Sequence, residues 1–212
     1  MLSDIEELLE LTNEEKDYLA SISYVKKYSK GEIVFYEHET LQYLYFLSSG
    51  CLMASQCDDE NKKIVLHVHH AKTFVGVAFV ILNEPSKITL ECLTSVTILK
   101  INSIKFQEYF FKKTKILYFF LQFISHRLYN NYSAFVLHEK FLSAIGKTAS
   151  FIKNEPTLFC TLSLGEISLI LNIQQPTLSN ILKILKEEKI IAKINGKIEI
   201  LNFQKLNEHI SL

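Results

Sequence analysis

Apolar residues recur at helical spacing in the first part of the chain. Over residues 3–22 they alternate with polar residues at this spacing, which predicts one or two short amphipathic helices. The segment Thr12-Asn13-Glu14-Glu15 supplies a helix start at their junction. The apolar positions are Ile5, Leu8, Leu9, Tyr18, Leu19 and Ile22.

Between Tyr24 and about Ile101 the pattern changes to short β-prone runs separated by turn residues. The turns are marked by Gly31, Gly50, Gly76 and the polar segment 58–61. Several short strands at regular spacing are typical of an antiparallel sandwich or jelly roll, here called the β-roll. The runs are VKKYSKGEIVFYEHE, YLYFLSSGCLMASQ, KKIVLHVHHAKTFVGVAFV and KITLECLTSVTILKI.

Helical periodicity returns from Ser103 to about Leu137 and includes a near-strict heptad repeat. Such a stripe could pack on its own domain, but three heptads with one polar member favour a parallel coiled-coil homodimer. Asn131 would then fix the register and the number of helices. A hinge is expected around residues 138–140, followed by a helix over 141–153. The seam positions are Leu117, Leu121, Ile124, Leu128, Asn131 and Phe135.

Residues 161–191 predict a helix-turn-helix. Ser163 and Glu166 have the spacing of a capping box, and Pro176 suits the first turn of a second helix. That second helix has an apolar stripe at Leu178, Ile181, Leu182 and Leu185. Its opposite face carries small polar and basic residues, as in helices that read DNA. An ordinary helical hairpin would be the alternative if this stretch stood alone.

Two β-prone runs follow, 190–194 and 197–201, joined by Asn195-Gly196. This dipeptide favours a type I′ hairpin turn, because both positions require φ > 0. A helix-turn-helix followed at once by a hairpin is a winged helix, and Lys193 and Lys197 are placed to touch phosphate.

Composition narrows the class of protein. The 212 residues are 48% hydrophobic and 22% charged with zero net charge, which suits one large or two modest globular domains. From Lys140 onward, nine lysines minus six glutamates leave a mild positive excess of three. The acidic amphipathic N-terminus is unlike a signal peptide and the apolar runs are too short to span a bilayer, so we expect a cytoplasmic protein with no membrane partner.

The order of these parts resembles the Crp–Fnr family of bacterial transcription regulators. KYSKGEIVFYEHE and YLYFLSSGCL are similar to the family's first β-roll hairpins, and IQQPTLSNILKILKEEKII to its recognition helix and the turn into the wing. The resemblance implies an α+β protein with a cyclic-nucleotide-binding-like β-roll sensor (residues 1–102), a dimerisation helix region (103–138) and a winged helix-turn-helix (139–212). It also implies a homodimer on a palindromic operator, a signal in the β-roll, and RNA polymerase as a partner if the protein is an activator.

The sensor departs from the cyclic-AMP-binding members. Gly76 of their Gly-Glu pair is kept, but Val77 replaces the glutamate, and Lys87-Ile88 occupies the Arg-Ser positions. Loss of the carboxylate and the bidentate guanidinium removes the basis for holding a cyclic phosphate, although Lys87 could still meet a phosphate as a point charge. No cysteine precedes Cys51, so the iron–sulfur centre of the oxygen-sensing members is not expected.

The recognition helix also differs from that of most family members, because Pro176 and Asn180 stand where they commonly carry Glu and Arg. Arginine reads guanine, whereas Asn and Gln suit adenine, and Arg127 in the long helix is the only arginine of the chain. We therefore expect an A/T-rich palindrome, with guanine reading by Lys183 as the alternative. The predicted DNA-binding residues are Gln174, Gln175, Pro176, Thr177, Ser179, Asn180, Lys183, Lys186, Lys193 and Lys197.

The signal itself stays open. His67, His69 and His70 share one predicted strand, which suggests a metal or haem ligand and a nitric-oxide, oxygen or metal sensor, or simply a polar strand edge. A cupin-like metalloenzyme is the rival class, but no later histidine of the roll completes its ligand set, so we expect no enzyme. Gly76, Lys87, His67 and His69 are the candidate effector residues, and no cofactor is certain. Cys51, Cys57 and Cys92 could sense redox state or act as small apolar residues.

Overall fold

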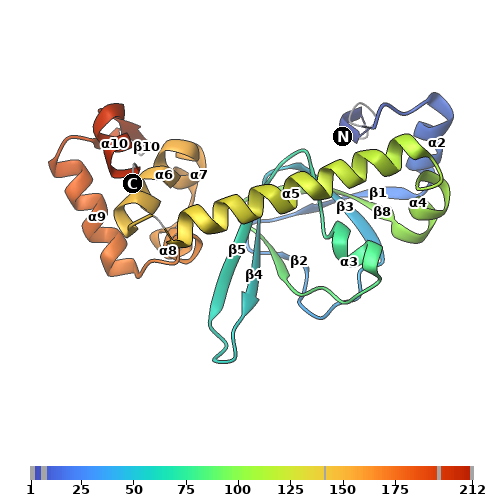
Figure 1. Ribbon diagram of the computed structural model, residues 1–212, viewed down its shortest axis with the longest axis horizontal. Coiled ribbons are helices and arrows are strands. Elements are labelled where there is room, and N and C mark those ends of the chain that lie inside the picture. The colour runs from blue at the N-terminus through green and yellow to red at the C-terminus, as the bar shows by residue number, and fades with distance from the viewer. Residues whose placement is uncertain (1–2, 6–8, 141, 195–196, 211–212) are drawn as a thin grey trace. The chain divides into compact units, whose positions relative to one another are not determined.

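The computed structural model describes residues 3–5, 9–140, 142–194 and 197–210, with the side chains of 131–140 and of Lys197 left out (Figure 1). The chain divides into two compact units, Met1–Leu128 and Tyr129–Leu212. Among the described residues, no helix combines the length and the apolar character that a membrane span needs.

The first unit is an antiparallel β-roll with helices, as predicted. One sheet has the order β1-β8-β3-β6 and the other β2-β7-β4-β5, and all their described pairings are antiparallel. Its elements are α2 (Asn13–Ser21), β1 (Ser23–Tyr28), β2 (Ile33–Phe35), β3 (Tyr43–Ser49), β4 (Cys51–Cys57), β5 (Lys63–His70), β6 (Thr73–Val75), α3 (Val77–Leu82), β7 (Thr89–Cys92), β8 (Val96–Asn102), α4 (Ser103–Phe110) and α5 (Thr114–Lys140).

Local signals set several of these boundaries. Thr12 and Glu15 form the capping box that starts α2. Gly50, at φ +87°, turns β3 into β4, where an added Cβ would collide with the carbonyl oxygen of Ser95. Asp58 closes the β4–β5 hairpin by accepting hydrogen bonds from the backbone of Glu60 (3.0 Å) and Lys62 (2.8 Å).

Three expectations need correction. The apolar run after Gly76 forms the helix α3 rather than strand, because Val77 and Val80 bury one face at helical spacing. The helix expected from Ser103 is two helices, and the turn between them lets Phe110 of α4 and Phe120 of α5 enter the same aromatic core. The hinge expected at 138–140 falls in the last turn of α5, which runs to Lys140.

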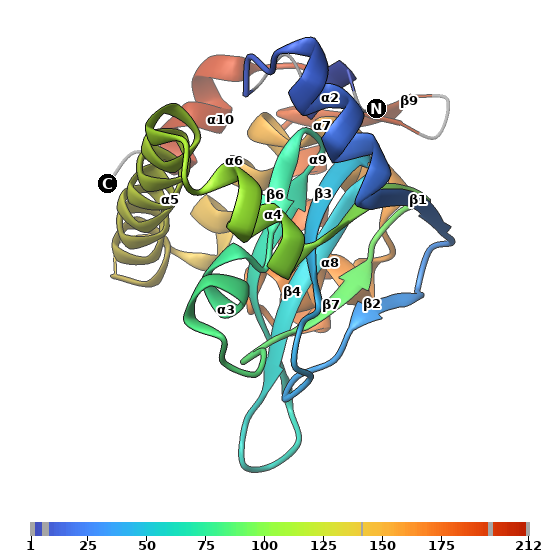
Figure 2. The same ribbon diagram turned by 90° about the vertical axis from the view of Figure 1, so that its right-hand side faces the viewer.

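The core of the first unit has an aromatic layer where helices α4 and α5 cover the sheet that contains β3 and β6 (Figure 2). Phe74 of β6 contacts Phe46 of β3 and Phe120 of α5, with ring centroids 5.0 and 5.1 Å apart. Phe106 of α4 stacks on Phe110 and meets Phe120. Aromatic ring contacts therefore hold helix α5 on the β-roll.

The second unit is a winged helix, as predicted. Helix α10, which follows the wing, packs on α6, and Gly146 of α6 allows this because an added Cβ would lie 2.8 Å from the carbonyl oxygen of His209. The elements are α6 (Ala144–Asn154), α7 (Pro156–Thr161), α8 (Leu164–Leu171), α9 (Gln175–Glu187), β9 (Ile191–Ile194), β10 (Lys197–Ile200) and α10 (Phe203–Ile210).

Candidate functional site

Helices α8 and α9 form the helix-turn-helix. Ser163 Oγ accepts a hydrogen bond from the Glu166 backbone at 3.2 Å, and Glu166 Oε2 accepts one from the Ser163 backbone at 2.7 Å, so both halves of the predicted capping box are present. Asn172 ends α8 in the left-handed conformation at φ 51°. The Ile173 N–H donates to the Ser168 carbonyl at 3.0 Å, and α9 begins only two residues later, at Gln175.

The two faces of α9 differ as the sequence predicts. The apolar residues Leu178, Ile181, Leu182 and Leu185 are all buried in the unit's core, which fixes the roll of the helix about its axis. The opposite face is solvent-exposed and carries amides, hydroxyls and ammonium groups, the donors and acceptors that contact base edges and phosphates. Its exposed candidates are Gln174, Gln175, Pro176, Thr177, Ser179, Asn180, Lys183 and Lys186.

The wing is the β9–β10 hairpin, in which Ile194 pairs with Lys197 and Ile191 with Ile200. Lys193 is exposed, whereas the Lys197 side chain and the Asn195-Gly196 turn lie outside the described residues. The Ile198 N–H donates to Cys160 Sγ at 3.1 Å, which ties β10 to α7.

The heptad seam of α5 is exposed in the single chain. Leu117, Leu121 and Leu128 are 50%, 61% and 71% exposed, and Ile124 is half-buried against the core. Asn131 and Phe135 continue the seam in the helix backbone, but their side chains are outside the described part.

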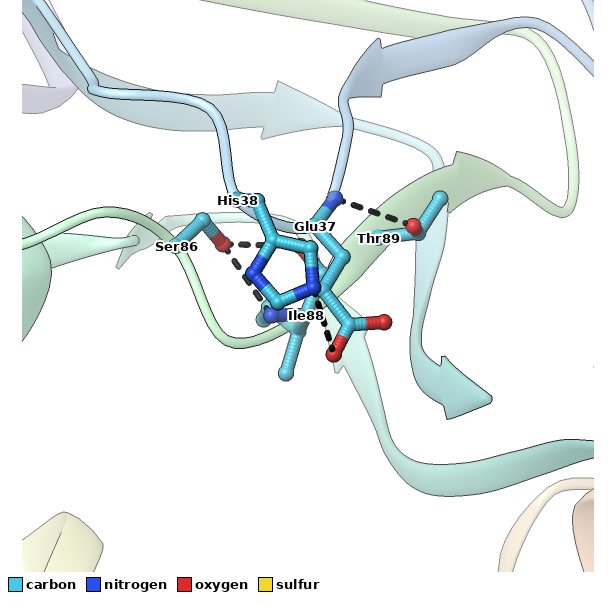
Figure 3. Close-up of polar contacts among 5 residues, drawn as sticks. All are labelled: Glu37, His38, Ser86, Ile88 and Thr89. Carbon is cyan, nitrogen blue, oxygen red and sulfur yellow. Dashed lines mark hydrogen bonds and ion pairs between the residues drawn. The ribbon is translucent and has the colours of Figure 1, made fainter. Parts of the chain in front are cut away.

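The residues at the positions that hold a phosphate in cyclic-AMP-binding members make contacts within the β-roll itself. Val77 is buried in α3, and an added Cβ on Gly76 (φ +72°) would lie 3.0 Å from Leu41 Cδ1. Buried Ser86 donates its hydroxyl to the Ile88 carbonyl at 2.7 Å and accepts the Ile88 N–H at 3.1 Å (Figure 3).

The same loop is tied to the segment before β3. The Glu37 N–H donates to Thr89 Oγ1 at 3.1 Å, as Figure 3 shows, and the His38 N–H donates to the Ser86 carbonyl at 2.6 Å. His38 Nε2 lies 3.9 Å from Glu37 Oε1 on the outer side of this junction. Lys87 is exposed, so this candidate effector residue points its charge to solvent.

The histidines of β5 meet a residue that the sequence did not connect with them. Arg127 of α5 donates through Nη1 to the Phe74 carbonyl at 2.8 Å and through Nη2 to His69 Nδ1. His67 and His69 lie on one strand face, ring centroids 4.6 Å apart. Burial, then the charge of Arg127, lower the pKa of His69 to about 2, so the ring is neutral and accepts at Nδ1.

A metal centre needs more ligands than this strand supplies. Within the described parts of the chain, no group of three or more His, Cys, Asp or Glu side chains could hold a metal ion. His67 and His70 are exposed, as expected for residues of a polar strand edge. His69 is buried, so that expectation was wrong for this residue.

The four cysteines differ in how far their side chains are exposed to solvent. Burial raises the pKa of the Cys92 thiol to about 12, with Glu32 and Glu91 adding to the effect, so this thiol stays protonated and unreactive at neutral pH. Cys57 is exposed, and Cys51 Sγ lies 3.6 Å from His70 Nδ1 across the β4–β5 pairing. None of the four cysteines, all in the described part, forms a disulfide.

Known families match both units. The sequence model of the cyclic nucleotide-binding domain matches residues 25–113, and that of the Crp-like helix-turn-helix domain matches residues 140–209. The cAMP-activated global transcriptional regulator CRP of Haemophilus influenzae is 25% identical over 209 residues, covering 90% of this chain and 92% of that protein.

Solved structures show the same fold. FixK2 from Bradyrhizobium japonicum aligns with a TM-score of 0.77 at 14% identity, over 90% of this chain and 98% of that one. A regulator of the Crp/Fnr family from Eubacterium rectale, described as putative, aligns with a TM-score of 0.77 at 15% identity, over 95% of both chains. With both family models matched in order along the chain, this protein belongs to the Crp–Fnr family and is a DNA-binding transcription regulator with a cyclic-nucleotide-binding-like sensor domain.

Proposed function

We propose that the protein acts as a homodimer that reads a palindromic, A/T-rich operator with two copies of α9. The observation that carries this proposal is the row of exposed leucines on α5, at Leu117, Leu121 and Leu128. Leucine side chains at 3.5-residue spacing on a long helix are the signature of a helix that pairs with another.

The energetics favour pairing through this helix. Full burial of one leucine contributes about 1.5–3 kcal/mol. Each chain has three leucines on this helix that are at least half exposed, so a dimer would bury six of them in a single seam. A parallel arrangement puts the same surface of both chains in contact, as two-fold symmetric dimers require. Two recognition helices would then match two half-sites with centres about 10 bp apart.

The base preference rests on the side chains that α9 exposes. Asn180 and Gln175 offer the paired donor and acceptor that suit the N6/N7 edge of adenine. Helix α9 carries no arginine, the side chain that forms paired hydrogen bonds with guanine. Lys183 is an exposed basic residue three positions after Asn180, and its ammonium lies 3.7 Å from Glu187 Oε1. Lys186 and Lys193 are assigned to phosphate, which carries no sequence information.

We further propose that cyclic AMP is not the signal. Val77 is buried and apolar where the related regulators use a carboxylate, and Lys87 is exposed. A haem or redox signal stays a prediction, for which an absorbance spectrum of the protein with haemin is the measurement. RNA polymerase is a partner only if the regulator activates transcription.

The signal would act through α5. A change in the β-roll that shifts the packing of α5 alters how two copies of this helix cross, and hence the spacing of the two recognition helices. Both major-groove contacts succeed together only when that spacing matches the DNA repeat, so a small change gates affinity.

The test combines stoichiometry with binding. Light scattering should give two chains in solution, and anisotropy with a labelled A/T-rich palindrome should give the same affinity with and without cyclic AMP. A monomer that binds the duplex as tightly, or a tenfold or greater gain with cyclic AMP, contradicts the proposal.

A further inference from the structure

Cys51 and His70 form a thiol–imidazole pair at the end of the β4–β5 hairpin opposite its turn. The two residues are paired across the strands, and Cys51 Sγ lies 3.6 Å from His70 Nδ1. His70 is exposed and Cys51 is partly exposed, so the pair lies at the surface of the β-roll. An imidazole within reach of a thiol can take up its proton, and the thiolate rather than the thiol is the nucleophile.

The backbone of Cys51 is fixed on the side away from His70. Its N–H donates to Thr94 Oγ1 at 3.0 Å, and its carbonyl accepts the Leu93 N–H at 3.0 Å. Gly50, at φ +87°, makes the tight turn that leads into it. A hydrogen-bonded strand end therefore presents the sulfur to the imidazole.

The other two cysteines of the first unit differ from Cys51. Cys92 is buried, and burial raises the pKa of its thiol to about 12. Cys57 is exposed at the far end of β4, where the residue across from it is Lys63 rather than a histidine. Cys57 is therefore an internal reference for an exposed thiol without this partner.

We propose that Cys51 is a modification site of the β-roll, at which a hydroperoxide oxidises the thiol to a sulfenic acid and His70 accepts the thiol proton. His70 Nδ1 takes the proton from Sγ, the thiolate attacks one peroxide oxygen, and the O–O bond breaks as the S–O bond forms. Hydrogen peroxide is thereby reduced to hydroxide, which receives the proton from His70 and leaves as water. The sulfur loses two electrons to the peroxide, so the step needs no other co-reactant.

The thiols within reach determine what happens to the product, because a sulfenic acid condenses with a second thiol nearby. Cys92 pairs with Leu52, the neighbour of Cys51, so its side chain points to the other face of the sheet. Cys57 is roughly 20 Å away along β4, at about 3.3 Å per residue. Within the first unit we therefore expect a sulfenic acid that persists, rather than a disulfide.

This inference rests on the proposed function only in naming the residue through which a redox signal would enter the β-roll. The experiment treats the reduced full-length protein, without DNA, with hydrogen peroxide at neutral pH and dimedone, which traps sulfenic acids. Peptide mass spectrometry follows each cysteine separately. A free cysteine is only about 3% thiolate at neutral pH, so proton transfer to His70 should make Cys51 react roughly tenfold faster than Cys57.

Variants of β5 test the role of the imidazole. His70→Asn keeps a polar group beside Sγ but cannot take up a proton, so it should slow Cys51 about tenfold and leave Cys57 unchanged. His67→Asn is the matched control, because it removes another exposed histidine of β5, one that is paired with Ala54. It should leave both rates within about twofold of the wild type. If His70→Asn does not fold by circular dichroism, His70→Gln replaces it with the same expectation.

Three results overturn the site: no dimedone adduct on Cys51, a Cys57 that reacts as fast as Cys51, or a Cys51 rate that the His70 variant leaves unchanged. Because DNA is absent from the reaction, a failure here leaves the proposed dimer and its DNA binding untouched. A failure of DNA binding likewise would not change the rates at the two thiols.

Discussion

Helices α5 and α9 present opposite kinds of surface. On α9 the apolar residues are buried in the helix's own unit and the exposed face is polar, with Asn180 and Lys183 at its centre. On α5 a row of apolar residues is itself exposed, with Leu121 and Leu128 more than half exposed. A buried apolar stripe fixes how a helix sits in its own fold, whereas an exposed apolar stripe calls for a partner.

This difference assigns the two surfaces to different partners. DNA offers phosphates and base edges, which polar side chains recognise, while a second α5 offers a complementary row of leucines. The predictions below separate the two roles, beginning with the change that should matter most.

Leu121→Glu should break the dimer, because it places two carboxylates in the proposed seam. Losing one of two linked recognition helices lowers the affinity for a palindrome by roughly 100-fold or more. The fold of the first unit should be kept, since Leu121 is 61% exposed. Light scattering and anisotropy measure both effects.

Gln122→Glu is the matched control for that change, because it adds the same charge at the next exposed position, off the seam. It should remain dimeric and bind DNA like the wild type. If both variants dissociate, or neither does, the seam is not the interface.

On α9, Asn180→Ala should change base choice, and Lys186→Ala should not. Loss of a paired contact to one base costs about 1–3 kcal/mol for the cognate sequence, so Asn180→Ala should flatten the preference at one position of each half-site. Lys186→Ala should weaken binding to all duplexes alike and reduce the salt dependence. Anisotropy on a set of single-base variants distinguishes the two, and identical uniform effects would refute this division of roles.

His69→Gln should flatten the dependence of stability on acid pH. The pKa of His69 is lowered to about 2 in the folded chain, so below about pH 6.5 the unfolded chain binds a proton that the folded one does not. The free energy of unfolding therefore falls as the pH drops below 6.5, by at most about 1.4 kcal/mol per unit from this group. Glutamine still accepts from Arg127 but does not titrate, and equal slopes in urea unfolding between pH 6.5 and 5 would count against the account.

Ser163→Ala should cost the second unit about 1 kcal/mol of stability, because the start of α8 loses its capping oxygen. Thermal unfolding measures the loss. Ser179→Ala, inside α9, serves as the control and should leave the melting temperature nearly unchanged without DNA.

Local patterns made much of this molecule predictable. The capping box at Ser163 depends on residues three apart, and the buried stripe of α9 on residues three or four apart, so both can be read from the sequence. The prediction of a strand after Gly76 was wrong, because the six-residue apolar run Val77–Leu82 is too short for its periodicity to separate strand from helix.

The contact between Arg127 and His69 was beyond such reasoning. It joins residues 58 positions apart and exists only because α5 packs across β5 and β6. A lone arginine stands beside the seam position Leu128, but no local pattern connects it with a strand histidine.

Selection of bound duplexes from a random DNA pool, with no cyclic nucleotide added, tests the central claim most directly. The account predicts an enriched palindrome with A/T-rich half-sites whose centres lie about 10 bp apart. A single unrepeated half-site, or half-sites with a strong G·C core, would contradict it.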